Sequence, residues 1–144
     1  MAVDVVSDIV ISRPREVVAA FAADPDNALR WYANIKRVTW QTDPPLAVGS
    51  RLAFVAQFLG RELAYTYEVL EHVPGERFVM STAEGPFPMT TTYAWDEAPG
   101  GTRMTLRNAG EPAGFARVTA PAMATAMRRA NRKDLAALKA LLES

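Results

Sequence analysis

The last third of the chain carries a helical pattern of apolar and basic positions. The stretch 122–142 contains neither glycine nor proline. At about 100° per residue, apolar residues collect on one face of a helix and basic residues on the opposite face. The apolar face consists of Met123, Met127, Ala130, Leu138 and Leu141, and the basic face of Arg128, Arg129, Arg132, Lys133 and Lys139. The pattern predicts an amphipathic helix of about 22 residues, roughly 33 Å long, which needs a broad surface to pack against.

Upstream of this helix, most of the chain alternates between apolar and polar residues with a period of two, which is typical of strands. Turn residues separate the alternating segments, among them Gly60, Pro74-Gly75 and Pro99-Gly100-Gly101. Consecutive strands that are joined by such short turns pair in an antiparallel manner. The predicted strands are 3–11, 35–42, 51–59, 61–73, 77–84, 89–97 and 102–108.

Two short helices are predicted between the first two strands. Pro14 lies where a helix can begin, because its missing N–H falls among the unpaired donors of a first turn. Asp24-Pro25 ends this helix, since a residue before proline avoids the α region. The two helices cover 14–23 and 26–32, and both are too short to be stable alone.

These elements predict an α+β fold with a curved antiparallel sheet of six to seven strands wrapped round the long C-terminal helix. The two short helices follow the first strand and help to close the concave face. Because no internal repeat, low-complexity tract or linker interrupts the chain, we expect a single domain over residues 1–144.

Composition and charge exclude several classes of function. Acidic and basic residues balance at 16 each, so net charge predicts neither nucleic-acid binding nor attraction to an anionic membrane. The absence of cysteine excludes disulfides and thiolate chemistry, and the single histidine excludes a site built on several imidazoles. No apolar run suggests stable membrane insertion, and no secretion signal is evident, so we expect a cytoplasmic protein. No cofactor or metal is predicted.

Several motifs spread over nearly the whole chain resemble those of one superfamily. They are Arg13-Pro14-Arg15-Glu16-Val17-Val18 with Asp24-Pro25 and Trp31, Val48-Gly49-Ser50-Arg51-Leu52, Tyr67-Glu68-Val69-Leu70-Glu71 with Pro74-Gly75-Glu76-Arg77-Phe78, and Gly101-Thr102-Arg103-Met104-Thr105-Leu106. With these motifs the chain resembles the START-like or birch-pollen-allergen-like (SRPBCC) superfamily, specifically its bacterial polyketide cyclase/dehydrase and lipid-transport group.

The resemblance implies a helix-grip fold with a hydrophobic cavity between the curved sheet and the terminal helix. Members of the superfamily hold lipids, steroids, polyketides or plant hormones there. Some are aromatase/cyclases or hydrolases, while many are only carriers. Fold alone therefore does not decide the function.

The inward face of the predicted sheet is rich in aromatic residues and methionine, which provide broad and adaptable apolar area. With the resemblance, this face is expected to bind a small hydrophobic molecule. A filled core is the alternative, because periodicity does not distinguish a filled barrel from a hollow one. The expected lining residues are Trp31, Phe54, Phe58, Tyr65, Tyr67, Met80, Tyr93, Trp95, Met104, Leu106, Asn108, Phe115, Met123 and Met127.

No catalytic residue is predicted. A cyclase or dehydratase needs a proton acceptor, and Glu84 is a candidate, although a solvated position beside Gly85-Pro86 is favoured. His72 is the only imidazole, and a position at an exposed strand end is favoured for it. Carrier or sensor, cyclase or dehydratase, and accessory protein with a filled cavity are the three functions that the sequence leaves open.

The terminal helix has one anomaly, because Asp134 lies within its apolar face and Asn131 lies toward the same side. A buried carboxylate must be paired or hydrogen-bonded. A ligand-facing acid is one interpretation, and an anchor to a backbone N–H, an arginine or a tryptophan of the first segments is the favoured one. Pro121 is expected to kink the helix, with Phe115, Met123 and Met127 facing a ligand and the second half purely structural.

Overall fold

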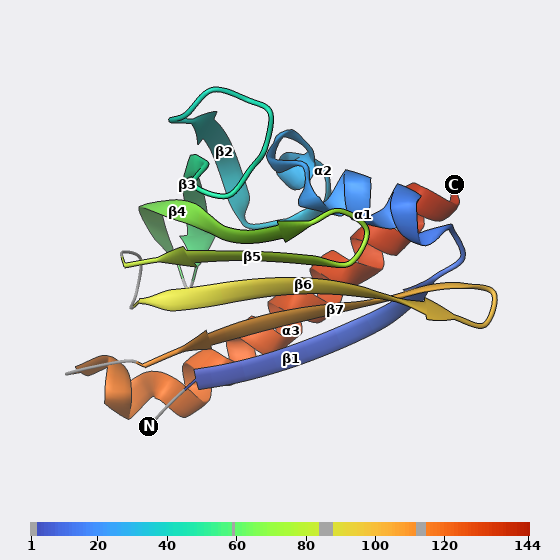
Figure 1. The fold of residues 1–144 in the computed structure, drawn as a ribbon. Coiled ribbons are helices and arrows are strands. Elements are labelled where there is room, and N and C mark those ends of the chain that lie inside the picture. Colours follow the sequence, from blue (N-terminus) through green and yellow to red (C-terminus); the bar gives the residue numbers. More distant parts are fainter. Residues whose placement is uncertain (1–2, 59, 84–87, 112–114) are drawn as a thin grey trace.

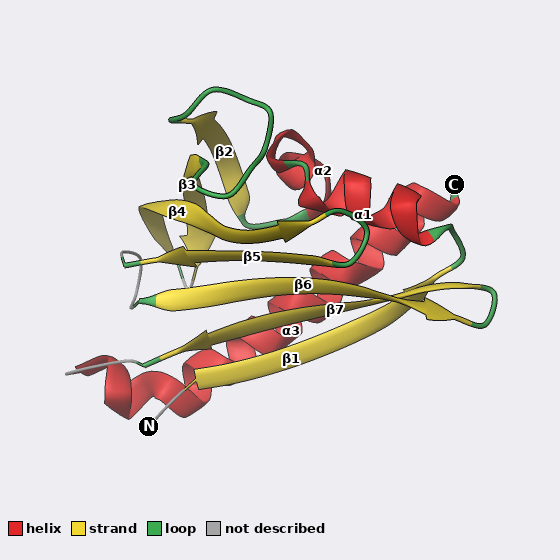
Figure 2. Cartoon of the chain, in the orientation of Figure 1, coloured by secondary structure: helices red, strands yellow, loops and turns green. Residues whose placement is uncertain are grey.

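The structure is a computed structural model that describes residues 3–58, 60–83, 88–111 and 115–144, and Figures 1 and 2 show its fold. Strands and helices follow one another in an order that matches the alternation and the turn residues of the sequence. The elements are β1 (Val3–Ile11), α1 (Arg15–Ala23), the 3-10 helix η1 (Pro25–Asn27), α2 (Ala28–Trp31), β2 (Ile35–Trp40), β3 (Arg51–Phe58), β4 (Arg61–Val73), β5 (Arg77–Thr82), β6 (Met89–Ala98), β7 (Gly101–Gly110) and α3 (Phe115–Glu143).

The strands form one seven-stranded sheet in the order β1-β7-β6-β5-β4-β3-β2. Every neighbouring pair is antiparallel, and β2 to β7 follow one another in sequence order, as expected for strands joined by short turns. The first strand pairs with the last along its whole length, from Val3 opposite Gly110 to Ile11 opposite Thr102. The predicted α+β helix-grip fold is thereby confirmed.

Helix α3 runs diagonally across one face of the sheet, and its C-terminal end lies beside α1 (Figure 1). It begins earlier than predicted, at Phe115, so that Pro121 lies inside the helix. Its buried face is also turned slightly from the predicted one: Leu135 and Leu142 are buried, whereas Leu141 is only half-buried. The difference is small because the apolar stripe of a helix is wide.

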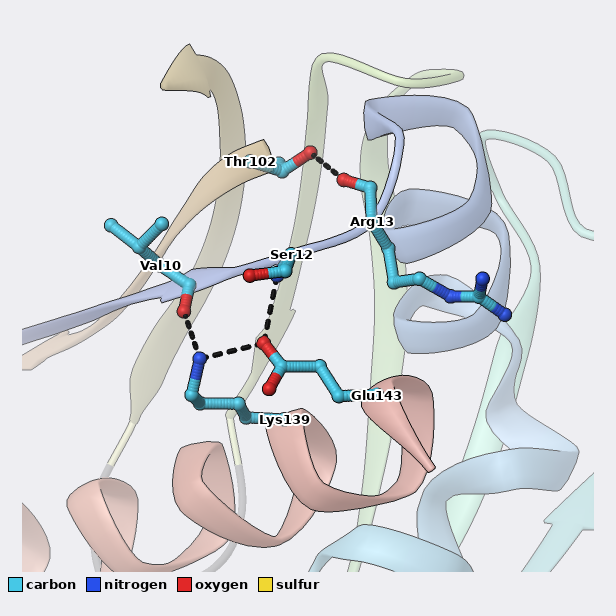
Figure 3. A network of polar contacts seen from close by, with 6 residues as sticks. All are labelled: Val10, Ser12, Arg13, Thr102, Lys139 and Glu143. Atoms are coloured by element: carbon cyan, nitrogen blue, oxygen red, sulfur yellow. Dashed lines mark hydrogen bonds and ion pairs between the residues drawn. The ribbon is translucent and has the colours of Figure 1, made fainter. Parts of the chain in front are cut away.

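A polar network fastens the C-terminal end of α3 to the end of β1 and the residue that follows it (Figure 3). Lys139 Nζ donates to the Val10 carbonyl at 2.8 Å and to Glu143 Oε2 at 2.6 Å. The same carboxylate oxygen accepts from the Ser12 N–H at 2.8 Å. The hydrogen bonds from Lys139 and Ser12 lower the pKa of Glu143. The far end of α3 is therefore held at a fixed place on the sheet.

No helix within the described ranges is long and apolar enough to cross a membrane.

Candidate ligand-binding cavity

A cavity of about 150 Å³ lies between the sheet and α3. Its walls come from the segment between α1 and β2, from strands β3 to β7, and from the middle of α3. Most of its surface is apolar, with Leu52, Phe54 and Phe78 among the buried lining residues. Polar side chains reach the lining at a few positions, which is the usual composition of a small-molecule site.

The structure brings about half of the predicted lining residues to this cavity. Those that line it are Phe54, Tyr65, Tyr67, Met80, Tyr93, Asn108 and Met127. Others are buried in the packed core beside it and do not line it; these are Trp31, Trp95, Met104 and Leu106. Met123 packs in a separate cluster with Val3, Val5 and Ala120. The side chains of Phe58 and Phe115 lie outside the described residues, as does Glu84.

The difference has a geometric cause. Alternation identifies the face of each strand but not the part of that face which α3 covers. Helix α3 packs along β1, the neighbour of β7, and Met104 and Leu106 are fully buried in one core cluster with Leu135 and Leu138 of α3. Asn108, near the other end of β7, does reach the cavity.

Lining residues that the sequence did not predict come from strands β2 to β6, from the connection between α1 and β2, and from α3. They include Tyr32, Asn34, Ile35, Gln57, Leu63, Phe78, Thr82, Met89, Thr91, Asn131 and Asp134. Thr91 precedes Tyr93 by two residues and so shares its face, a signal that was available in the sequence. Tyr32 follows the short helix α2, where no periodicity reveals its direction.

One polar network lies on the sheet side of the cavity. Thr91 Oγ1 donates to Asn108 Oδ1 at 2.7 Å and lies 3.2 Å from the Tyr67 hydroxyl. Because a threonine hydroxyl has a single proton, which here goes to Asn108, Tyr67 must be the donor to Thr91. Burial raises the pKa of Tyr67, and the hydrogen bond to Thr91 opposes this rise. The phenol proton of Tyr67 is therefore engaged within the protein.

The second polar feature of the cavity is a pair of hydrogen-bonded tyrosines. The hydroxyls of Tyr32 and Tyr93 hydrogen-bond to each other, and the Trp31 ring lies 4.1 Å from the Tyr32 ring and 5.8 Å from the Tyr93 ring, between centroids. Burial is the main cause that raises the pKa of both phenols, and the charge of Asp134 raises them further. Both phenols are consequently neutral at physiological pH. One proton of the pair lies between the two oxygens, and the other is available.

Asp134 is both anchored to the first segments and part of the cavity lining. Its Oδ1 accepts a hydrogen bond from the Ala33 N–H at 3.1 Å, so the expected tie to a backbone N–H of the first segments is present. The residue also lines the cavity, together with Asn131. The second half of α3 therefore reaches the candidate cavity as well as anchoring the helix. Burial raises the pKa of Asp134 to about 6, against the opposing effects of the Ala33 hydrogen bond and Lys133.

His72 differs from the position expected for it. It is half-buried, with its ring 5.8 Å from the ring of Phe78, centroid to centroid. A register shift between Val69 and Glu71 changes the alternation of β4 before this point, so that His72 pairs with Phe78 on β5. Bulges of this kind invert the face of the residues that follow them.

His72 lines a second hollow, of about 480 Å³, between α1, the segment before β3 and the β4–β5 turn. This hollow is larger than the cavity under α3, but exposed residues such as Glu16, Ala20 and Pro74 form its rim. Much of its volume is therefore open to solvent. The cavity under α3 is the better candidate site, because most of its lining residues are buried. Among the described residues, no group of three or more histidines and carboxylates could hold a metal ion.

Comparisons with known proteins agree with this geometry. The family described as "Polyketide cyclase / dehydrase and lipid transport" matches residues 2–143. No curated protein matches the sequence.

Solved structures of low sequence identity share the fold. TTHA0849 from Thermus thermophilus is 19% identical over 94% of both chains, with a TM-score of 0.81. The Zhui aromatase/cyclase from Streptomyces sp. R1128 is 14% identical over 99% of this chain and 94% of its own, also with a TM-score of 0.81. The di-domain ARO/CYC StfQ from the steffimycin biosynthetic pathway is 11% identical over 97% of this chain and 50% of its own, with a TM-score of 0.82. Since the family match spans nearly the whole sequence, the chain belongs to the polyketide cyclase/dehydrase and lipid transport family.

Proposed function

We propose that the protein binds a small hydrophobic molecule in the cavity between the sheet and α3. The observation that carries this proposal is the space itself: buried apolar and aromatic side chains surround about 150 Å³ that they do not fill. An apolar cavity of about this volume admits a molecule as large as benzene. A ligand with a single ring matches the size.

Two further features support binding rather than a filled, vestigial cavity. The lining includes Met80, Met89 and Met127, whose flexible side chains adapt to different ligand shapes. Polar groups stand at defined places in an otherwise apolar wall, where they would orient a ligand. The family and the aromatase/cyclases among the structural neighbours are in keeping with a ligand in this place.

Filling the cavity is expected to abolish binding without unfolding the protein. Ala130 is half-buried on α3 and lines the cavity, so a phenyl ring introduced by Ala130→Phe would occupy the space. We expect the affinity for toluene, measured by ligand-observed NMR, to fall at least about tenfold. Ala136→Phe is the matched control, because Ala136 is exposed on the same helix and does not line the cavity.

If the wild-type protein and Ala130→Phe bind toluene equally well, the ligand binds elsewhere. A wild-type protein that binds no apolar probe would favour an accessory role with a closed cavity. Native mass spectrometry of the protein purified from its host, followed by extraction of any bound molecule, would identify the natural ligand.

A cyclase or dehydratase is the second candidate function, and one observation favours it. A proton acceptor with a pKa near the working pH is the most effective general base, and Asp134 has a pKa of about 6 within the cavity. The free proton of the Tyr32–Tyr93 pair could stabilise a developing enolate oxygen. Turnover of a short poly-β-ketone that is lost in Asp134→Asn would establish this function, and binding without turnover would exclude it for that substrate.

A further inference from the structure

The charges around the cavity are of one sign. Its described lining contains two carboxylates, Asp24 and Asp134, and no lysine, arginine or histidine. Asp24 Oδ1 is already engaged by the Asp26 N–H at 3.0 Å. The basic residues of α3, such as Arg129 and Arg132, lie on its exposed side. A cavity of this kind repels an anionic head group and attracts a cation.

Asp134 has unused capacity to accept hydrogen bonds. An ionised carboxylate offers about four lone-pair sites on its two oxygens. Oδ1 accepts the Ala33 N–H, whereas Oδ2 accepts no hydrogen bond from a described residue, and no cation forms an ion pair with it there. Asp134 as a whole residue is nevertheless only 3% exposed. A buried carboxylate is normally paired with a cation or fully hydrogen-bonded, and Asp134 is neither among the described residues.

A second polar group without a partner stands beside it. Asn131 precedes Asp134 by three residues, and so shares its side of the helix, and it also lines the cavity. It is 6% exposed, and its Nδ2 has no hydrogen-bond partner among the described residues. The two ends of a side-chain amide are exchanged by a half-turn, so Asn131 can present either an acceptor or a donor to a ligand.

Aromatic side chains of the cavity wall also favour a cation. The faces of Phe54, Phe78 and the tyrosines carry partial negative charge, which attracts a cation in the cavity. We infer that the ligand is a small apolar amine whose protonated nitrogen binds the free oxygen of Asp134, with Asn131 as a further acceptor. This inference rests on the proposed binding function and adds the chemical class of the ligand.

The pH dependence of binding follows from the groups that face Asp134. Tyr32 and Tyr93 pack near it and stay neutral, Asp24 lines the same cavity, and Lys133 is its exposed neighbour on α3. Asp134 must be ionised to bind an ammonium group, and its pKa is about 6. At about pH 5 only a tenth of the protein is then competent, so the apparent affinity should be about tenfold weaker than at about pH 8.

The test compares probes of similar size by isothermal titration calorimetry at about pH 8: benzylamine, toluene and benzoate. We expect benzylamine to bind at least about tenfold more tightly than toluene, and benzoate not to bind. In Asp134→Asn the preference for benzylamine over toluene should disappear. Asp96→Asn, an exposed position on β6, should retain it. The affinity for benzylamine should also fall at about pH 5 in the wild-type protein.

The outcomes separate this inference from the proposed function. Toluene binding without a preference for benzylamine would overturn the amine assignment and leave the binding function intact. A preference for benzylamine that survives Asp134→Asn would equally overturn the role of Asp134. Failure of all three probes to bind would overturn both the binding function and the amine assignment.

Discussion

Gly101→Ala is expected to lower the free energy of unfolding by about 3 kcal/mol, because the new methyl group would collide with the backbone of β1. A Cβ at Gly101 would lie 2.1 Å from the Ile11 carbonyl oxygen and 2.9 Å from both the Ile11 carbonyl carbon and Ser12 Cα. These are backbone atoms at the end of the β1–β7 pairing, so relief requires the two strands to separate locally. Urea denaturation monitored by circular dichroism measures the loss.

Gly100→Ala provides the matched control at the adjacent position. Gly100 has φ of 80°, and a Cβ there would meet nothing within 4 Å. Its replacement carries only the cost of a left-handed backbone for alanine, about 1 kcal/mol. Equal losses for the two variants would contradict the close approach of β1 to Gly101.

The same pair of glycines shows what the sequence can and cannot predict. Pro99-Gly100-Gly101 was expected to form a hairpin turn, and β6 and β7 are joined there. That expectation succeeds because the positive φ of a turn residue is a local requirement. The reason for Gly101 is not local, since it depends on Ile11, which lies far away in the sequence and reaches it only through the β1–β7 pairing.

Most of the sheet was predictable for the same physical reason. Strands 3–11 and 61–73 were predicted with the bounds that β1 and β4 have, because alternation and flanking turn residues are local signals. The start of the terminal helix was predicted too late. The gap-free pattern was predicted to begin only after Pro121, which was expected to kink the helix, whereas α3 starts at Phe115 and contains Pro121.

The candidate site was predictable only in part. Alternation placed Phe54, Tyr67 and Tyr93 on the inner face, and these residues line the cavity. It also placed Leu106 there, which is fully buried in the packed core instead. Whether an inward-facing residue lines the cavity or packs in the core depends on the position of α3 on the sheet. That position is set by the packing of many side chains at once. An anchor from Asp134 to the first segments was predicted, but Ala33 as its partner was not, because the two residues come together only in the folded chain.

The second large effect is expected for Asp134→Asn, which should stabilise the protein at about pH 8. The pKa of Asp134 rises from 3.8 to about 6 on folding, so the folded state binds this proton more tightly than the unfolded state. As pH rises from about 4 through 6 and Asp134 ionises, the free energy of unfolding of the wild-type protein therefore decreases by up to about 3 kcal/mol. Asparagine has no charge to bury, and its amide oxygen can still accept the Ala33 N–H.

Comparing the wild type with Asp134→Asn at each pH isolates the contribution of the Asp134 carboxyl group. Asp4 and Glu143 have lowered pKa values and lose their favourable interactions in acid, but they do so equally in both proteins. We expect Asp134→Asn to be more stable than the wild type by about 2 kcal/mol at about pH 8, and the difference to vanish near pH 4.

Chemical denaturation at a series of pH values measures the difference, with Asp96→Asn as an exposed control that should follow the wild type. An asparagine variant less stable than the wild type at about pH 8 would mean that the Asp134 carboxylate is compensated in the free protein. Its free oxygen would then have no need of a ligand cation. The stability measurement and the amine titration thus test the same buried charge independently, one without ligand and one with it.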